Sequence, residues 1–211
     1  MSTILTGSEA LLDWAVATQP LAGQVVSGDL HLVQPFADGV LVAVVDGLGH
    51  GEEAALAARA AVAELAGRAD QSVLTLLQHC HHVLHGLRGV VMSLASFNAR
   101  KSILTWAGVG NVEGFLMRAQ AGADRKYLLL RGGTIGYQLP PLRASQLPVQ
   151  PGDTLIFITD GIHGGFDKTL VVGNTPVQAA ERILQQVAKN TDDALVLVAR
   201  WRWLAAVGTL P

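Results

Sequence analysis

Residues 40–65, VLVAVVDGLGHGEEAALAARAAVAEL, decide the fold. An apolar run ends at Asp46, three glycines then alternate with Leu48 and His50, and an alanine-rich segment follows. The apolar run predicts a buried strand, and the alanine-rich segment predicts a helix with two glutamates in its first turn. A strand end holds a carboxylate rigidly while it faces solvent or a cleft, and the following glycine lets the backbone turn toward a ligand.

Other acids occupy similar positions along the chain. TLIFITDGIHGGF (154–166) places Asp160 after an apolar strand and before a glycine, DDALVLVAR opens with Asp192 and Asp193, and VVSGDLHL contains Asp29. Converging carboxylates repel one another unless they are protonated or a cation lies between them. Oxygen ligands select hard ions such as Mg²⁺ or Mn²⁺, and two ions about 4 Å apart could activate a bridging water. An isolated Asp-Gly is usually a turn, so spacing alone leaves both interpretations open.

The bulk composition is that of a compact protein. Half of the 211 residues are apolar, 15% are charged and the net charge is -2, which gives no electrostatic case for binding nucleic acid or an anionic membrane. We predict a single domain over residues 1–211. A lone cysteine, Cys80, excludes an internal disulfide and fits a reducing cytosol, and we recognise no signal peptide or membrane span. We therefore expect a cytoplasmic protein.

Short strand-like runs rich in Val, Ile, Leu and Thr dominate the chain. We predict strands at about 10–18, 24–34, 39–45, 89–98, 102–108, 111–118, 126–131, 154–159 and 193–201, and helices at about 51–67, 71–86 and 175–189. Short connections favour antiparallel hairpins over repeated βαβ units. The predicted class is α+β, with two sheets packed face to face and helices outside.

Five segments together resemble the metal-dependent serine/threonine protein phosphatases of the PPM class, specifically the bacterial SpoIIE-like branch. They occur in the family's order and cover nearly the whole chain: SGD at 27–29, VVDGLGHG at 44–51, AGVGN at 107–111, PGDTLIFITDGI at 151–162 and DDALVLVAR at 192–200. Within that branch, LRGVVMSLASFN and TWAGVGNVEGFL look most like the short phosphatases that reset the stress-signalling stressosome. The resemblance implies an αββα sandwich.

The resemblance also implies a metal centre that holds Mn²⁺ or Mg²⁺, with two ions expected. Its residues would be Asp29, Asp46, Gly47, Asp160 and Asp192. Asp46 would bridge both metals, the Gly47 carbonyl would bind one, and Asp46 and Asp160 would be the catalytic pair. Asp192 would bind the second metal, with Asp193 as the candidate if the register differs. Asp29 would act through metal-bound waters or as a ligand of the first metal.

The chain departs from the larger eukaryotic relatives in three ways. Their histidine two places after the bridging aspartate is replaced by Leu48, whereas His50 matches the SpoIIE-like branch. We interpret His50 as a helix-entry residue that packs near the site and assign it no proton transfer. Leu195 stands where a threonine that does not bind metal is usual. The arginine that grips phosphate is not identified; the candidates are Arg88, Arg131 and Arg143.

The function implied is hydrolysis of phosphoserine or phosphothreonine by metal-activated water. The implied partners are phosphorylated STAS-domain stressosome proteins, and their dephosphorylation would reset a stress-signalling pathway. One alternative is a phosphatase of an anti-sigma-factor antagonist outside a stressosome. Another is a non-catalytic binding module with this fold, although a module of that kind should have lost at least one of the acids.

Other patterns have simpler interpretations. In HCHHVLH (79–85), His81 and His85 share a helix face, as zinc ligands can, but no acid or second ligand cluster accompanies them. We interpret them as a solvated or packed helix face. Cys80 lacks an arginine at the spacing of a cysteine phosphatase. Trp201 and Trp203 are interpreted as core or edge packing.

Overall fold

The computed structural model describes residues 2–202 except 10, 121, 123, 167–169, 171–172 and 190. Its strands form two sheets in which every named pair of neighbours is antiparallel. The first sheet has the order β1-β2-β11-β10-β7-β8. Its strands are β1 (Thr3–Ser8), β2 (Leu12–Gln19), β11 (Ala194–Trp201), β10 (Thr154–Ile158), β7 (Glu113–Met117) and β8 (Lys126–Tyr127).

The second sheet has the order β3-β4-β5-β6-β9. Its strands are β3 (Asp29–Phe36), β4 (Gly39–Gly47), β5 (Val90–Asn98), β6 (Ile103–Val109) and β9 (Ser145–Pro148). Three helices complete the described fold: α1 (Glu52–Ala66), α2 (Val73–Val83) and α3 (Pro176–Val187). Local sequence explains the start of α3, where Thr175 and Gln178 form a reciprocal capping box and Pro176 occupies the first turn.

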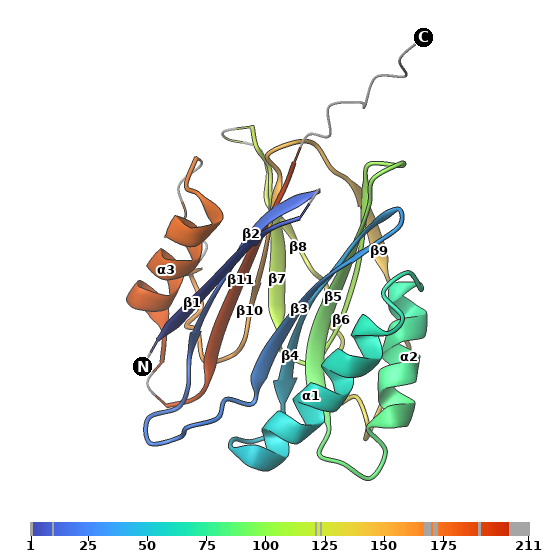
Figure 1. The fold of residues 1–211 in the computed structure, drawn as a ribbon, viewed down its shortest axis with the longest axis vertical. Helices are drawn as coiled ribbons and strands as arrows, with labels where there is room; N and C mark the ends of the chain where they lie inside the picture. The colour runs from blue at the N-terminus through green and yellow to red at the C-terminus, as the bar shows by residue number, and fades with distance from the viewer. Residues whose placement is uncertain are drawn as a thin grey trace.

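The molecule has four layers, with the two sheets face to face between the helices (Figure 1). Side chains between the sheets form one core that includes Phe97, Trp106 and Phe157. A second core lies between the five-stranded sheet and α1 and α2, and a third lies between the six-stranded sheet and α3. The predicted αββα sandwich with mainly antiparallel sheets is therefore confirmed.

Most predicted elements are present, with three differences. The predicted 24–34 strand begins only at Asp29, because residues before it form a loop whose Gly28 N–H is bound by a side chain from another segment. The predicted 126–131 strand pairs with β7 over two residues only. The prediction missed β1 and β9, which are edge strands and mostly exposed, so neither shows the apolar pattern of a buried strand.

The strand register explains how distant acids reach one end of the sandwich. The start of β3 lies beside the end of β4, and Asp29 is the partner of Asp46 in the ladder. The end of β10 likewise lies beside the start of β11, where the Thr159 N–H donates to the Leu195 carbonyl over 3.1 Å. Acids that flank these four strand ends therefore gather at the same edge.

Two remaining predictions concern the surface and the end of the chain. Within the described ranges, no helix is both long and apolar enough to cross a bilayer. Trp201 is 6% exposed and stacks on Phe97 with ring centroids 5.3 Å apart, so it belongs to the core as predicted. Trp203 lies outside the described residues.

Candidate metal centre and active site

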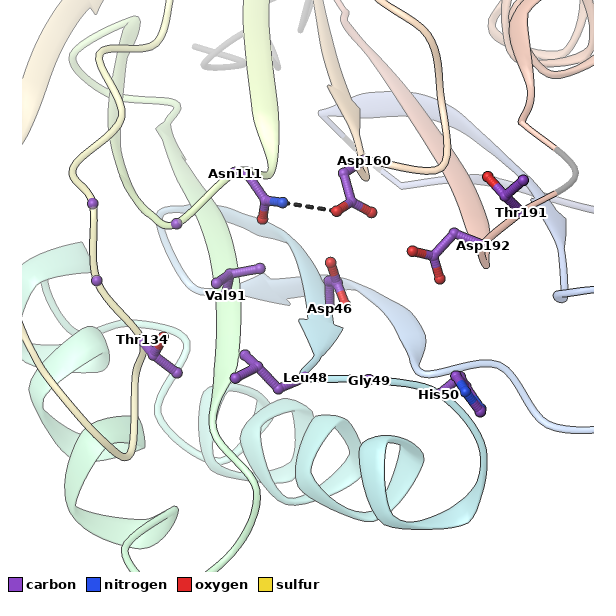
Figure 2. Close-up of a pocket in the computed structure, with 13 residues that line it drawn as sticks. Asp46, Leu48, Gly49, His50, Val91, Asn111, Thr134, Asp160, Thr191 and Asp192 are labelled. Atoms are coloured by element: carbon purple, nitrogen blue, oxygen red, sulfur yellow. Dashed lines mark hydrogen bonds between the residues drawn. The ribbon is translucent and has the colours of Figure 1, made fainter.

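A pocket of about 580 Å³ opens where the ends of the two sheets meet. Figure 2 shows Asp46, Asp160 and Asp192 directing their carboxylates into the same space. Asp46 comes from the five-stranded sheet, and the other two flank strands of the six-stranded sheet. The other described lining residues are Leu48, Gly49, His50, Val91, Gly110, Asn111, Gly132, Gly133, Thr134 and Thr191. This lining contains three carboxylates and no lysine or arginine.

The glycines after Asp46 shape the loop beside the pocket, and of these Gly49 lines it whereas Gly47 is not among its described lining residues. Gly47 lies so close to α1 that an added Cβ would be 2.2 Å from the Ala54 carbonyl oxygen. Gly49 and Gly51 have φ of 85° and 77°, in the left-handed region that side chains disfavour. The loop can therefore turn tightly from β4 into α1 and keep Asp46 at the pocket wall.

The surroundings of Asp46 disfavour its charged form. Burial and, after it in order of effect, the negative charges of Asp160, Asp192 and Asp193 together raise the pKa of its carboxyl to about 8. A carboxylate in such surroundings is stabilised as an anion when a cation is bound beside it. The position of Asp46 therefore favours a bound cation.

Asp29 lies beside Asp46 but behind the pocket wall. Its side chain is 4% exposed, and Oδ2 accepts a hydrogen bond of 2.7 Å from the Thr159 hydroxyl. Burial, followed by the charge of Asp46, raises its pKa well above the usual value. The Thr159 hydroxyl also accepts from the Leu195 N–H over 2.9 Å. Thr159 thus links both sheets directly behind the acids, a role that sequence analysis missed.

Asp160 is the exposed member of the set and is held from two sides. Asn111 Nδ2 donates to its Oδ2 over 2.8 Å (Figure 2). Lys189 Nζ donates to its main-chain carbonyl over 2.6 Å. Asn111 ends the AGVGN segment, so the motif contained the signal, but no role was assigned to this side chain. The Asn111 contact orients the carboxylate of Asp160, and the Lys189 contact holds its main chain.

The two neighbouring acids before β11 have different surroundings. Asp193 is 3% exposed, and its carboxylate accepts the N–H groups of Leu21 and Gly28, both over 2.7 Å. Asp192 lines the pocket instead, and partial burial raises its pKa. Asp192 is therefore the one of the two acids that a cation in the pocket could reach, whereas Asp193 is occupied by main-chain N–H groups.

The donor set fits a hard divalent cation that keeps much of its water. Among the described residues, no three His, Cys, Asp or Glu side chains form a complete ligand cluster for one ion. Mg²⁺ characteristically uses one or two carboxylates and several waters. Carboxylates on opposite walls of an open pocket suit that mode, and they do not form the closed cage of a structural zinc site.

The remaining candidates are divided between the pocket and other parts of the fold. His50 lines the pocket directly before Gly51, the N-cap of α1, and is exposed. Arg88 bonds the Leu48 carbonyl at the edge of the pocket, whereas Arg131 and Arg143 are not among its described lining residues. His81 Nδ1 accepts the Gly136 N–H over 3.0 Å, so this ring packs within the fold. Cys80 is fully buried and burial raises its thiol pKa to about 12, which excludes a reactive thiolate.

Comparison with known proteins identifies relatives over most of the chain. Residues 37–202 match the family described as Stage II sporulation protein E (SpoIIE). Phosphoserine phosphatase RsbX of Bacillus subtilis (strain 168) is 24% identical over 141 residues, which is 67% of this chain and 70% of RsbX.

Solved structures share the fold over nearly the full length. One of these structures is 29% identical to this chain in sequence. It comes from work on the bacterial stressosome as a modular system that has been adapted to control secondary messenger signaling. It has a TM-score of 0.82 and covers 90% of this chain and 99% of its own. A crystal structure of RsbX in complex with magnesium is 20% identical, with a TM-score of 0.84 and coverage of 94% and 100%.

Proposed function

The chain belongs to the SpoIIE family, and on this premise we propose that it is a divalent-metal-dependent phosphoserine/phosphothreonine protein phosphatase. The resemblance to the SpoIIE-like branch drawn from its motifs is thereby confirmed. The observation that carries the proposal is the meeting of Asp46, Asp160 and Asp192 at one pocket, from strand ends of two sheets. RsbX, a relative, is a phosphoserine phosphatase and has been crystallised with magnesium.

Each acid has a defined part in this proposal. Asp46, Asp160 and Asp192 would hold Mn²⁺ or Mg²⁺ through carboxylate oxygens, and the Gly47 carbonyl would add a further oxygen. Asp29, buried behind Asp46, orients that ligand and adds negative charge. When bound, two divalent ions supply a water of lowered pKa and offset the charge on the phosphoryl oxygens. Asn111 keeps Asp160 in place.

The proposed substrates are phosphorylated STAS-domain proteins of a stressosome. Support comes from the RsbX relative and from the similar structure described in work on the bacterial stressosome. Their dephosphorylation would reset the signalling pathway that phosphorylation had activated. The retained acids argue for an enzyme over a non-catalytic binding module.

Phosphate release tests the proposal directly. The purified chain is incubated with a phosphorylated stressosome STAS protein and, in parallel, a phosphorylated anti-sigma-factor antagonist, each with Mn²⁺, Mg²⁺ or EDTA. We expect metal-dependent release, faster from the stressosome protein. Release only from the antagonist would replace the substrate assignment, and no release from either protein with any metal would support the binding module.

A further inference from the structure

A second pocket of about 610 Å³ adjoins the acidic pocket. It is lined by Leu48, Gly49, Leu87, Arg88, Gly89 and Tyr137. Leu48 and Gly49 also line the acidic pocket, so the two cavities share a wall made by the loop that follows Asp46. If a substrate peptide places its phosphoryl group beside Asp46, the peptide residues next to the phosphorylated one therefore lie close to this second pocket.

The second pocket is unusually apolar for an open surface. Leu48, Leu87 and Tyr137 are 42%, 38% and 85% exposed. Single exposed apolar side chains are ordinary, but three that surround one cavity form a patch that another apolar group can cover. The charged wall residue, Arg88, is already paired with Glu53 at 2.6 Å and with the Leu48 carbonyl at 3.3 Å. The surface therefore suits an apolar side chain better than an acidic one.

Hydrogen bonds hold this pocket in shape. Val90 and Ile135 exchange two main-chain hydrogen bonds of 3.0 and 2.9 Å, which join the segment before Tyr137 to the start of β5. The Gly136 N–H donates to His81 Nδ1 on α2. Gly136 has a φ of 92°, and an added Cβ would meet Leu84 at 2.8 Å. Because Tyr137 sits on an anchored segment, binding there orders little additional chain.

We propose that this second pocket binds an apolar side chain next to the phosphorylated residue of a protein substrate. The inference rests on the proposed phosphatase function and adds a source of sequence preference to it. The occupant is an extended phosphoserine or phosphothreonine segment, because the second pocket shares the wall formed by Leu48 and Gly49 with the acidic pocket. Leu87 and Tyr137 are specificity-determining residues and take no part in hydrolysis.

The test compares two phosphopeptides that differ only in the residues flanking one phosphothreonine. One peptide has leucine at the two positions on each side, and the other has serine there. With Mn²⁺, we expect kcat/KM of the wild-type chain to be roughly tenfold higher for the leucine peptide, mainly through KM, which is the scale of one apolar side chain entering a pocket. The variants Leu87→Ser and Tyr137→Ala should reduce this preference and leave hydrolysis of the serine peptide unchanged.

Matched controls use exposed residues away from both pockets. Tyr127→Ala and Leu129→Ser alter side chains that are 60% and 69% exposed, and both variants should retain the wild-type preference. Thermal melting checks that every variant is folded. Equal hydrolysis of the two peptides by the wild type, or an equal loss on both peptides in the Leu87 and Tyr137 variants, would overturn the inference while leaving the phosphatase function intact. Failure to hydrolyse either peptide or any phosphoprotein would overturn the function itself.

Discussion

The two strand–Asp–Gly junctions, one in each sheet, place similar sequences in different environments. Asp46 ends β4, which is hydrogen-bonded on both sides, and burial with neighbouring acids raises its pKa to about 8. Asp160 follows β10 and is exposed, with Asn111 bonded to its carboxylate. The first acid would therefore need a bound cation to be stabilised as an anion, whereas a hydrogen bond from the protein already orients the second.

The glycines at the two junctions also have different neighbours. Gly47 faces the Ala54 carbonyl on α1, whereas an added Cβ at Gly161 would lie 1.9 Å from the Asp193 carbonyl oxygen. The Gly47 contact sets how α1 approaches the pocket. The Gly161 contact sets the spacing between the Asp160 turn and the acids before β11. The Asp-Gly dipeptide thus sets the position of α1 relative to the five-stranded sheet, and in the six-stranded sheet it sets the position of the segment that carries Asp192 and Asp193.

The largest effect should come from removing the carboxylate at either junction. Asp46→Asn and Asp160→Asn should each lower kcat/KM on the order of 10³-fold, because a ligand oxygen at the reacting centre is lost. Mn²⁺ should raise the melting temperature of the wild type through preferential binding to the folded state. Asp46→Asn should abolish this rise, and Asp160→Asn should reduce it less.

Phosphate release and thermal melting with Mn²⁺ or EDTA measure both effects. In EDTA, Asp46→Asn should melt no lower than the wild type, because a neutral amide does not repel the neighbouring acids. Undiminished turnover in both variants would show that the acids are wrongly assigned. A melting-temperature rise with Mn²⁺ as large in Asp46→Asn as in the wild type would contradict the prediction that Asp46 contributes more to metal binding than Asp160.

Asp192 and Asp193 lie in the segment that packs against the Asp160–Gly161 junction. Asp193→Ala should lower the free energy of unfolding by about 3 kcal/mol, since the N–H groups of Leu21 and Gly28 lose a charged acceptor. Asp192→Ala should lower stability in EDTA by only about 1 kcal/mol, since the Asp193 N–H loses Asp192 Oδ1 as its acceptor, and should reduce Mn²⁺ binding. Urea unfolding and metal titration separate the two roles, and equal stability losses would contradict the assignment.

Gly161→Ala tests the close approach between the Asp160 turn and Asp193. The added methyl cannot fit without moving the main chain, so unfolding should become easier by about 2 kcal/mol. Gly164→Ala is the matched control, because an added Cβ there meets nothing within 4 Å. Urea unfolding of both variants measures the difference. A Gly161→Ala variant as stable as its control would mean that the turn adapts freely.

Sequence predicted the layers of the fold because its central strands are continuous apolar runs. It failed at β1 and β9, whose edge positions leave most side chains in water. The acids at strand ends were predicted as a set. Which of Asp192 and Asp193 enters the pocket depends on the partners of Asp193 more than 160 residues away, and no local pattern reports such a contact.

Two supporting residues were missed for a related reason. Thr159 looks like an ordinary β-branched strand residue, yet its hydroxyl bonds Asp29 and the Leu195 N–H across two sheets. Asn111 looks like a turn residue after a glycine, yet it contacts an acid 49 positions later. Their roles depend on which strand ends meet, and that meeting is a property of the complete sandwich.

The smallest effect we expect comes from replacing Asn111. This residue forms a hydrogen bond with Asp160, whereas the proposal relies on a cation to stabilise Asp46. Asn111→Ala should lower turnover at limiting Mn²⁺ by about tenfold, because Asp160 loses the hydrogen bond that orients it. Excess Mn²⁺ should restore much of this loss, and thermal stability in EDTA should change little. Asn111→Asp should be worse at low Mn²⁺, because it sets a second carboxylate against Asp160. A loss in Asn111→Ala that is independent of metal concentration would instead place Asn111 in contact with the substrate.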